Sequence, residues 1–166
     1  YPTQDKSKTI LGVEQWEWLE NELSKENDLL IIVSSIQVLA TNHVFEKWHN
    51  FPHERERLLK LLENISSPVI ILSGDRHKAG LYRSKNIIEM TSSSMNKPIS
   101  RPFRFIWDLL FKETDDLLNG EMYYGENYGV LTIGVNQNLM LELKGIDGEL
   151  ILQHTIKKGA LKAPSS

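Results

Sequence analysis

Two short, continuously apolar runs separated by a helical pattern constrain the fold of this chain more than any other feature. The runs are residues 29–33 and 68–72, and residues 52–64 between them place leucines behind a charged first turn that starts at Pro52. Unbroken apolar runs are typical of parallel strands covered on both faces, and Pro suits the first turn of a helix. A strand, a helix and a strand in this order form one crossover unit, so both carboxyl ends are expected on the same edge of a sheet.

The remaining segments predict an α/β fold of the α+β sandwich type. An amphipathic helix is expected over residues 12–25 and a third strand over 86–91, and the apolar spacing across 103–118 indicates a further helix. Three strand-like runs joined by strong turn sequences then predict a closing antiparallel β meander. These runs are residues 128–135, 139–143 and 149–156.

Composition limits the class of protein. Of the 166 residues 40% are hydrophobic, which is enough for one core, and the net charge of −3 provides no general basic field for nucleic acid or anionic membrane. Because the chain has no cysteine, a metal site must use oxygen and nitrogen ligands. No apolar run approaches the roughly 20 residues that cross a bilayer. We therefore expect no specific nucleic-acid partner and no membrane span.

The chain starts at Tyr1 with a polar stretch that could not begin a compact domain, so we expect that a preceding part has been cut away. The expected unit is a single partial domain over residues 1–166. Within it we expect a leading linker at 1–9, a crossover unit with a ligand loop at 10–93, a loop and helix at 94–126, and the meander at 127–157.

Directly after the second apolar run comes Gly74, followed by Asp75, Arg76 and His77. Residues i and i+2 of an extended segment face the same side, so the Asp75 carboxylate and the His77 imidazole can face one cation or two adjacent ones. Iron, zinc, manganese and, with more oxygen ligands, calcium suit these donors. For an isolated Gly-Asp-x-His sequence the simpler interpretation is a turn in which Asp75 caps a loop and His77 is merely exposed.

Other polar side chains lie near the same expected edge. Gln37 and Ser35 follow the first strand and could bind a substrate or a metal-bound water, although such residues more often only terminate strands. Gln37 is the stronger candidate. Trp48, in the loop that follows, could stack on a substrate, while tryptophans at such positions usually belong to the core or its rim.

Two further patterns have structural explanations. His43, His49 and His53 are spaced by six and four residues, which matches no helix-borne zinc pair that continues from a first ligand, so only His43 is kept as a weaker candidate. The charge run at residues 54–57 predicts a solvated helix face with i,i+3 or i,i+4 pairing.

Several segments resemble, in order and spacing, the later motifs of the PhoD-like alkaline phosphatases, across roughly residues 9–135. They are residues 11–19, 33–39, 45–59, 72–77, 91–93 and 127–129. The resemblance implies the C-terminal half of a calcineurin-like metallophosphatase domain, with two sheets packed face to face, flanking helices and a dinuclear metal centre. Ser94 stands where glycine is expected in that family.

The function that the resemblance implies is metal-dependent hydrolysis of phosphoric esters, monoesters or diesters, by a metal-activated water. Asp75 and His77 would be metal ligands and catalytic residues, and iron and calcium are the metals that the family indicates, with zinc or manganese as alternatives. Arg76 is expected to brace phosphate oxygens, although its side chain should alternate away from its two neighbours. Together with Gln37 and Trp48 it forms the expected set of contacts to a small phosphate-ester substrate.

The earlier motifs of the family, which supply most metal ligands, have no counterpart in this chain. We therefore expect the isolated chain to be inactive and to need the missing N-terminal half of the same domain as its partner. The family also indicates an extracellular or periplasmic location, which nothing in the sequence supports independently. The competing interpretation is a truncated, non-catalytic interaction module on the same fold, whose meander binds a partner.

Overall fold

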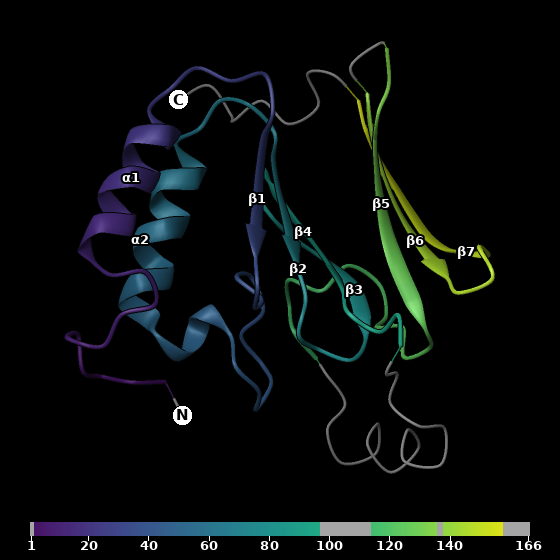
Figure 1. Cartoon of the computed structure of the whole chain (residues 1–166), viewed down its shortest axis with the longest axis horizontal. Helices are drawn as coiled ribbons and strands as arrows, with labels where there is room; N and C mark the ends of the chain where they lie inside the picture. The colour runs from purple at the N-terminus through teal and green to yellow at the C-terminus, as the bar shows by residue number, and fades with distance from the viewer. Residues whose placement is uncertain (1, 97–113, 136–137, 158–166) are drawn as a thin grey trace.

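Three layers of secondary structure make up the chain: a pair of helices, a four-stranded sheet and a three-stranded sheet (Figure 1). The structure is a computed structural model, and it describes residues 2–96, 114–135 and 138–157. Its elements in chain order are α1 (Val13–Leu23), β1 (Leu30–Ser34), the 3-10 helix η1 (Trp48–Asn50), α2 (Pro52–Glu63), β2 (Val69–Ser73), β3 (Ala79–Ser84), β4 (Ile87–Ser92), β5 (Asn127–Ile133), β6 (Leu139–Gly145) and β7 (Leu150–Ile156).

The four-stranded sheet has the order β1-β2-β4-β3. Strands β1, β2 and β4 are parallel, with Leu30 opposite Val69 and Val69 opposite Ile87, and β3 runs antiparallel to β4. The predicted crossover unit and third strand are therefore confirmed. Strand β3 was not predicted, and it pairs with β4 through a tight turn in which Lys85 has a φ of 52°.

Strand β2 separates two hydrophobic cores. Its residues alternate, because Val69 and Ile71 pack in the core beneath the helices whereas Ile70 packs in the core between the two sheets. All three side chains are fully buried. A strand at the centre of a layered sandwich needs apolar side chains on both faces, which explains the unbroken apolar run in this segment.

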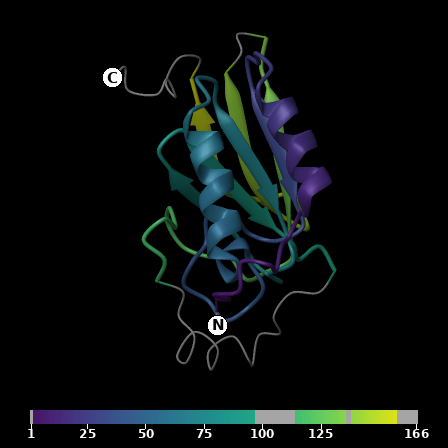
Figure 2. The ribbon, with the colours of Figure 1, turned by 90° about the vertical axis from the view of Figure 1, so that its left-hand side faces the viewer.

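The two helices lie side by side over one face of the four-stranded sheet (Figures 1 and 2). Helix α2 begins with Pro52 in its first turn, as predicted, and buries Leu58 and Leu62. Between the helices, Arg57 makes an ion pair with Glu20 at 2.7 Å. Arg57 also lies over the Trp16 ring, 4.3 Å from its centroid, so a charged side chain from α2 covers the main apolar anchor of α1.

The three-stranded sheet is the predicted antiparallel meander, in the order β5-β6-β7. It packs on the sheet face opposite the helices, and Leu139 and Leu141 of β6 fill the space between the sheets. Gly129 lets β5 approach β4 closely, since a Cβ at this position would lie 2.8 Å from Met90 Cε. The fold class, an α+β sandwich of two sheets with flanking helices, is confirmed.

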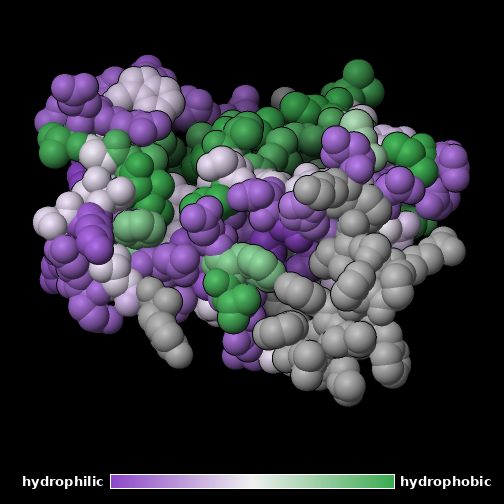
Figure 3. All heavy atoms as spheres, turned by 60° about the horizontal axis from the view of Figure 1, so that its bottom comes forward, coloured by the Kyte–Doolittle hydropathy of each residue, from purple (hydrophilic) through white to green (hydrophobic). Residues whose placement is uncertain are grey.

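In the described part of the chain, β1 is one edge strand of the four-stranded sheet and β5 is one edge strand of the three-stranded sheet, and both lie on the same side of the molecule (Figures 1 and 2). On β1, Ile31 is 40% exposed and Val33 is 80% exposed. The prediction that this strand is covered on both faces is therefore wrong for the described residues. On this side, hydrophobic side chains form a band between the helices and the three-stranded sheet (Figure 3).

Two expectations concern other parts of the chain. Most of the helix expected over residues 103–118 lies outside the described residues, and residues 114–118 form a turn and an isolated bridge. None of the described helices has the length and apolar character that a membrane crossing requires.

Candidate functional site

The chain turns sharply as it leaves β2. Asp75 and His77 have positive φ angles of 55° and 50°, so the extended geometry assumed for this segment is not observed. A non-glycine residue in this left-handed region costs on the order of 1 kcal/mol or more and keeps that conformation only where surrounding contacts hold it. The two side chains are nevertheless both exposed, and Arg76 between them is 5% exposed.

Ser93 ties this turn to the end of β4. Its hydroxyl accepts a hydrogen bond from the backbone N–H of Arg76 at 2.8 Å and donates one to the backbone oxygen of Lys78 at 3.3 Å. A Cβ placed on Gly74 would lie 3.7 Å from Ser93 Cβ and 3.8 Å from the backbone oxygen of Ser35. The carboxyl ends of β1, β2 and β4 therefore converge beside the turn, at the lower end of the sheet in Figure 1.

Gln37 lies inside the protein at this convergence. Its side chain is fully buried, and its Nε2 donates a hydrogen bond of 2.8 Å to Thr91 Oγ1. Within the described part of the chain, its Oε1 is buried and accepts no hydrogen bond. A buried acceptor without a donor is costly, so this oxygen is an unused hydrogen-bond acceptor among the described residues.

The loop after Gln37 is buried although it belongs to no strand. Val38 and Leu39 are fully buried, so their backbone groups need partners within the protein. Glu89 accepts hydrogen bonds from both N–H groups, at 2.9 and 2.6 Å, and Arg55 donates to both carbonyl oxygens, at 2.7 and 2.8 Å. Two oppositely charged side chains from different elements thus hold one dipeptide.

Asp115 continues this arrangement along the same loop. Its Oδ2 accepts hydrogen bonds from the N–H groups of Thr41 and Asn42, at 2.5 and 3.0 Å. Burial on its own raises the pKa of Asp115, but hydrogen bonds from the N–H groups of Thr41, Leu117 and Asn42 outweigh that effect and hold the pKa below its ordinary value. The carboxylate is therefore stabilised as a fixed anchor of the loop.

Glu89 is the functional candidate that the sequence reading missed. It is fully buried in β4, and burial raises the pKa of its carboxyl, against the opposing effects of the Ser73 hydroxyl, the N–H groups of Leu39 and Val38, and the Arg55 guanidinium. The available signal was one carboxylate inside an otherwise apolar strand, because acidic residues are almost never fully buried unless they are paired.

The prediction of a solvated charge run at residues 54–57 is only half correct. Glu56 and Lys60 form the expected exposed i,i+4 pair at 2.7 Å. Glu54, however, is 4% exposed, and Arg55 points into the loop after β1. The helical periodicity turns residues 54 and 55 toward the core side of α2, where buried N–H and C=O groups provide their partners.

Trp48 is placed in the core beneath the helices, with 5% of its surface exposed. Its Nε1 donates to Ser34 Oγ at 3.1 Å, and its ring meets the Trp16 ring edge to face, with centroids 6.3 Å apart. This position gives Trp48 a packing role, so we do not include it in the proposed site.

His43 lies beside the turn, in a strongly positive environment. Burial, together with the smaller effects of the charges on Arg76, Lys47 and Lys78, lowers its pKa to about 2. The guanidinium of Arg76 lies 5.2 Å from the ring centroid of Phe45, the aromatic neighbour of His43. A neutral imidazole with three cations near it marks a region of positive potential behind the exposed pair of Asp75 and His77.

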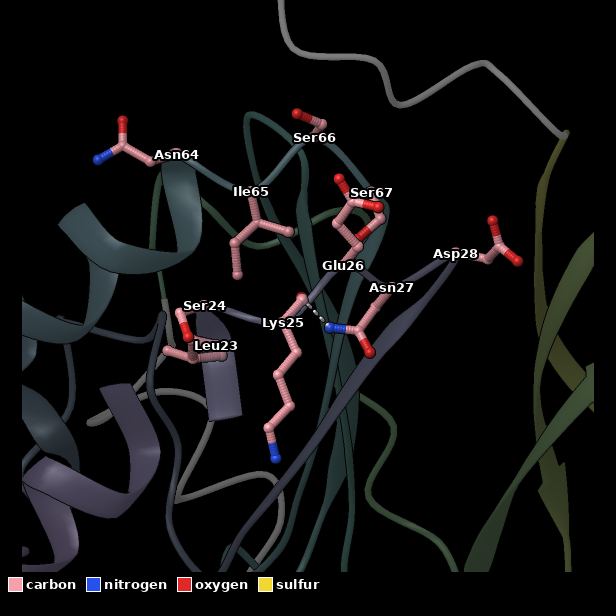
Figure 4. A pocket seen from close by; sticks show the side chains of 10 residues that line it. All are labelled: Leu23, Ser24, Lys25, Glu26, Asn27, Asp28, Asn64, Ile65, Ser66 and Ser67. Carbon is pink, nitrogen blue, oxygen red and sulfur yellow. Dashed lines mark hydrogen bonds between the residues drawn. The ribbon is translucent and has the colours of Figure 1, made fainter. Parts of the chain in front are cut away.

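Two hollows open at opposite ends of the parallel strands. One, of about 580 Å³, lies between the two sheets, at the carboxyl ends of β1, β2 and β4, and its lining includes Ser35, Gly74 and Ser94. Ser94 Oγ is buried there and has no hydrogen-bond partner among the residues that the structure describes. The other, of about 600 Å³, lies before β1 and β2, between residues 23–28 and 64–67 (Figure 4). The first adjoins the turn at residues 74–78, whereas the second lies away from it and is not part of the candidate site.

The donor set fits part of a metal centre. Asp75 and His77 offer a carboxylate and an imidazole to solvent at the end of a buried strand, and both groups are common ligands of transition metals. Within residues 2–96, 114–135 and 138–157, no three His, Cys, Asp or Glu side chains group closely enough to hold a metal ion. The described residues can therefore supply two ligands and not a complete site.

The fold defines the chain as part of a two-sheet α/β sandwich domain, in which the parallel strands β1, β2 and β4 end beside the turn at residues 74–78. A family model described as PhoD-like phosphatase matches residues 1–103. The chain therefore belongs to the PhoD-like phosphatase family. A search of curated proteins found no match.

Two solved structures have a similar fold. One is described as the structure of PhoD, with 18% identity and a TM-score of 0.59 over 97% of this chain. The other is GAP50, described as the anchor in the inner membrane complex of Plasmodium, with 16% identity and a TM-score of 0.62 over 90% of this chain. The matches cover 39% and 45% of those two proteins, so the chain spans less than half of each.

Proposed function

We propose that this chain supplies one part of the active site of a metal-dependent phosphoric ester hydrolase, with Asp75 and His77 as metal ligands. The observation that carries the proposal is the exposed pair of Asp75 and His77 on a constrained turn, directly after buried strand β2. Ligands of open α/β sheets collect at this end of parallel strands. Membership of the PhoD-like phosphatase family supports the same reaction class.

When bound, two cations would polarise the phosphate ester and lower the pKa of a water molecule that attacks it. Iron and calcium are proposed first, with zinc or manganese as alternatives. In this chain, Asp75 and His77 would hold the cations, and Gln37 Oε1 would orient the attacking water or the substrate by accepting a hydrogen bond. Arg76 would contribute positive charge from behind the turn, where low exposure weakens solvent screening.

The remaining ligands would come from the missing N-terminal half of the domain. Each cation needs about four or more donors, and the described residues offer two. The hollow between the sheets reaches the turn, and Ile31 and Val33 beside it leave apolar surface on edge strand β1. We propose that the missing half packs against this side and brings its ligands to the same edge.

The test is substitution in the full-length protein. Asp75→Asn and His77→Ala are expected to lower turnover of a phosphate ester by two or more orders of magnitude without loss of the folded state. Asp147→Asn, in the turn between β6 and β7, is the matched control and should leave turnover unchanged. Near-normal turnover in either folded site variant would refute the assignment. Parallel assays with a phosphomonoester and a phosphodiester identify the substrate class.

A non-catalytic interaction module is the second candidate. It is favoured by the similarity to GAP50, whose description names an anchor, and by the two edge strands that lie on one side. The two proposals differ in the full-length sequence, because a hydrolase needs further Asp, Asn and His ligand motifs there. A full-length protein that lacks those motifs and hydrolyses no phosphate ester would support the module.

A further inference from the structure

Two hydroxyl groups, those of Thr91 and Ser73, lie between the Gln37 side chain and Glu89. Gln37 Nε2 donates to Thr91 Oγ1 at 2.8 Å, and the hydroxyls of Thr91 and Ser73 lie 2.9 Å apart. The Ser73 hydroxyl also lowers the pKa of the Glu89 carboxyl, so the two groups lie close to each other. Because Thr91 Oγ1 accepts from the Gln37 amide, its own hydrogen remains for Ser73.

The same carboxylate also holds the backbone that carries Gln37. Its two oxygens accept the N–H groups of Val38 and Leu39, the two residues that follow Gln37. Arg55 donates hydrogen bonds to the two carbonyl oxygens of this dipeptide, and its positive charge lowers the pKa of Glu89. One buried acidic residue therefore fixes the main chain next to Gln37, while Thr91 holds the side-chain NH2 group.

The consequence concerns Gln37 Oε1. Because Nε2 donates to Thr91, the amide cannot rotate without losing this hydrogen bond. Oε1 is therefore the atom left without a donor in the described structure. Ser73, whose hydroxyl belongs to this network, directly precedes the turn that carries Asp75. The network thus sets which amide atom is left without a donor, and it links Gln37 to the start of that turn.

We propose that Glu89 is a positioning residue, which fixes the Gln37 amide with Oε1 ready to accept a hydrogen bond from the substrate or the attacking water. This inference rests on the proposed hydrolase function and assigns a role to a residue that touches neither metal nor substrate. Its effect on the reaction passes through Gln37, so the two residues must be energetically coupled.

The first test measures hydrogen exchange of the chain without ligand. Glu89→Gln puts an amide NH2 group where an acceptor is required, and exchange of residues 36–41 should accelerate at least about 10-fold. Glu54→Gln is a matched control, because Glu54 is also a buried acceptor of two consecutive backbone N–H groups, those of Ile10 and Leu11. It should accelerate exchange at residues 10–11 and leave residues 36–41 unchanged. Unchanged exchange at 36–41 in Glu89→Gln would overturn the proposal.

The second test measures kcat/KM in the full-length protein. Glu89→Gln should lower kcat/KM by about 10- to 100-fold, the usual effect of losing a group that orients a site residue. In a Gln37→Ala background the same substitution should have little further effect, whereas Glu54→Gln should leave kcat/KM unchanged in both backgrounds. Additive losses from Glu89→Gln and Gln37→Ala would show that Glu89 acts only on stability, and would overturn the positioning role.

Two further variants distinguish a failure of the Glu89 proposal from misfolding and from a failure of the proposed hydrolase function. If Glu89→Gln does not fold, Thr91→Val is used instead, because it removes the hydroxyl that lies between Gln37 and Ser73. This variant should lower kcat/KM, while hydrogen exchange at residues 38 and 39 stays slow. Full activity of a folded Thr91→Val variant would then refute the proposal. Asp75→Asn reports on the proposed function alone, because turnover that survives this change rejects the hydrolase site whatever the exchange data show.

Discussion

The indole Nε1 of Trp16 donates a hydrogen bond of 2.8 Å to Oε1 of Glu54, which joins α1 to α2 through a buried carboxylate. The second oxygen of Glu54 accepts the N–H groups of Ile10 and Leu11, at 3.0 and 3.2 Å. The carboxylate therefore anchors the chain that enters α1 as well as the helix itself. Substitution at this position should be costly although sequence alone places it in a charged surface run.

Glu54→Ala is expected to destabilise the chain by about 2 to 4 kcal/mol, because it leaves two backbone donors and one indole donor without an acceptor. Urea denaturation followed by circular dichroism measures the change. Glu56→Ala, two residues further along the same helix and exposed, is the control and should leave stability nearly unchanged. Equal effects of the two substitutions would contradict the anchoring role of Glu54.

Acid should destabilise the folded chain through His43. Burial and the charges of Arg76, Lys47 and Lys78 lower the pKa of its folded-state imidazole from 6.5 to about 2, against a smaller opposing effect of Asp115. The unfolded state therefore binds the proton first, so the contribution to stability is fully present above pH 6.5 and declines as pH falls toward 2.

The measurement compares urea midpoints of the wild type and His43→Gln between pH 7.5 and 4.5. The variant should lose less stability over this range than the wild type, while Asp115, His49 and His154 titrate equally in both proteins. Burial lowers the pKa of His49 and of His154 as well, so part of the acid sensitivity should remain in the variant. Parallel pH profiles for the two proteins would exclude a neutral, buried His43.

The isolated chain should bind metal ions weakly. Asp75 and His77 are two donors, and the structure brings no third His, Cys, Asp or Glu to them among the residues it describes. Calorimetric titration with calcium, zinc or ferric iron should give no sub-micromolar site. Sub-micromolar binding that is lost in an Asp75→Ala, His77→Ala double variant would contradict the need for ligands from the rest of the domain.

The exposed edge at β1 should promote self-association of the isolated chain. Val33 is 80% exposed on an edge strand, and such strands pair with other chains unless a charge prevents it. Val33→Lys is expected to shift the chain toward monomer in size-exclusion chromatography with light scattering. Val44→Lys is the control, because Val44 is 77% exposed but lies in a loop. If the wild-type chain is already monomeric at high concentration, this edge does not mediate self-association.

Much of the architecture follows from local patterns. The apolar runs at residues 29–33 and 68–72 identified β1 and β2, and the helical period identified α1 and α2 within two residues of their ends. Turn sequences identified the meander. These features depend on neighbours a few positions apart along the chain, so they can be read without knowing the fold.

The candidate site could be predicted only in outline. The sequence located Asp75, His77 and Gln37 at strand ends, but it did not give the left-handed backbone of the turn or the buried amide of Gln37. For Trp48 it left a substrate contact and a core position open, and the structure places this side chain in the core. Backbone conformation and burial at these positions depend on contacts from β4 and α2, which no local pattern encodes.

Residue order thus specified the helices, the strands and the edge at which polar groups would meet, since periodicity and crossover geometry are properties of the chain itself. The roles of Glu54, Arg55 and Glu89 emerged only when distant segments packed together. Each of these charges is held in the interior because backbone groups from elsewhere in the chain need a partner there. Such pairing is a property of the packed structure, and it decides which charged residues are structural anchors and which remain in solvent.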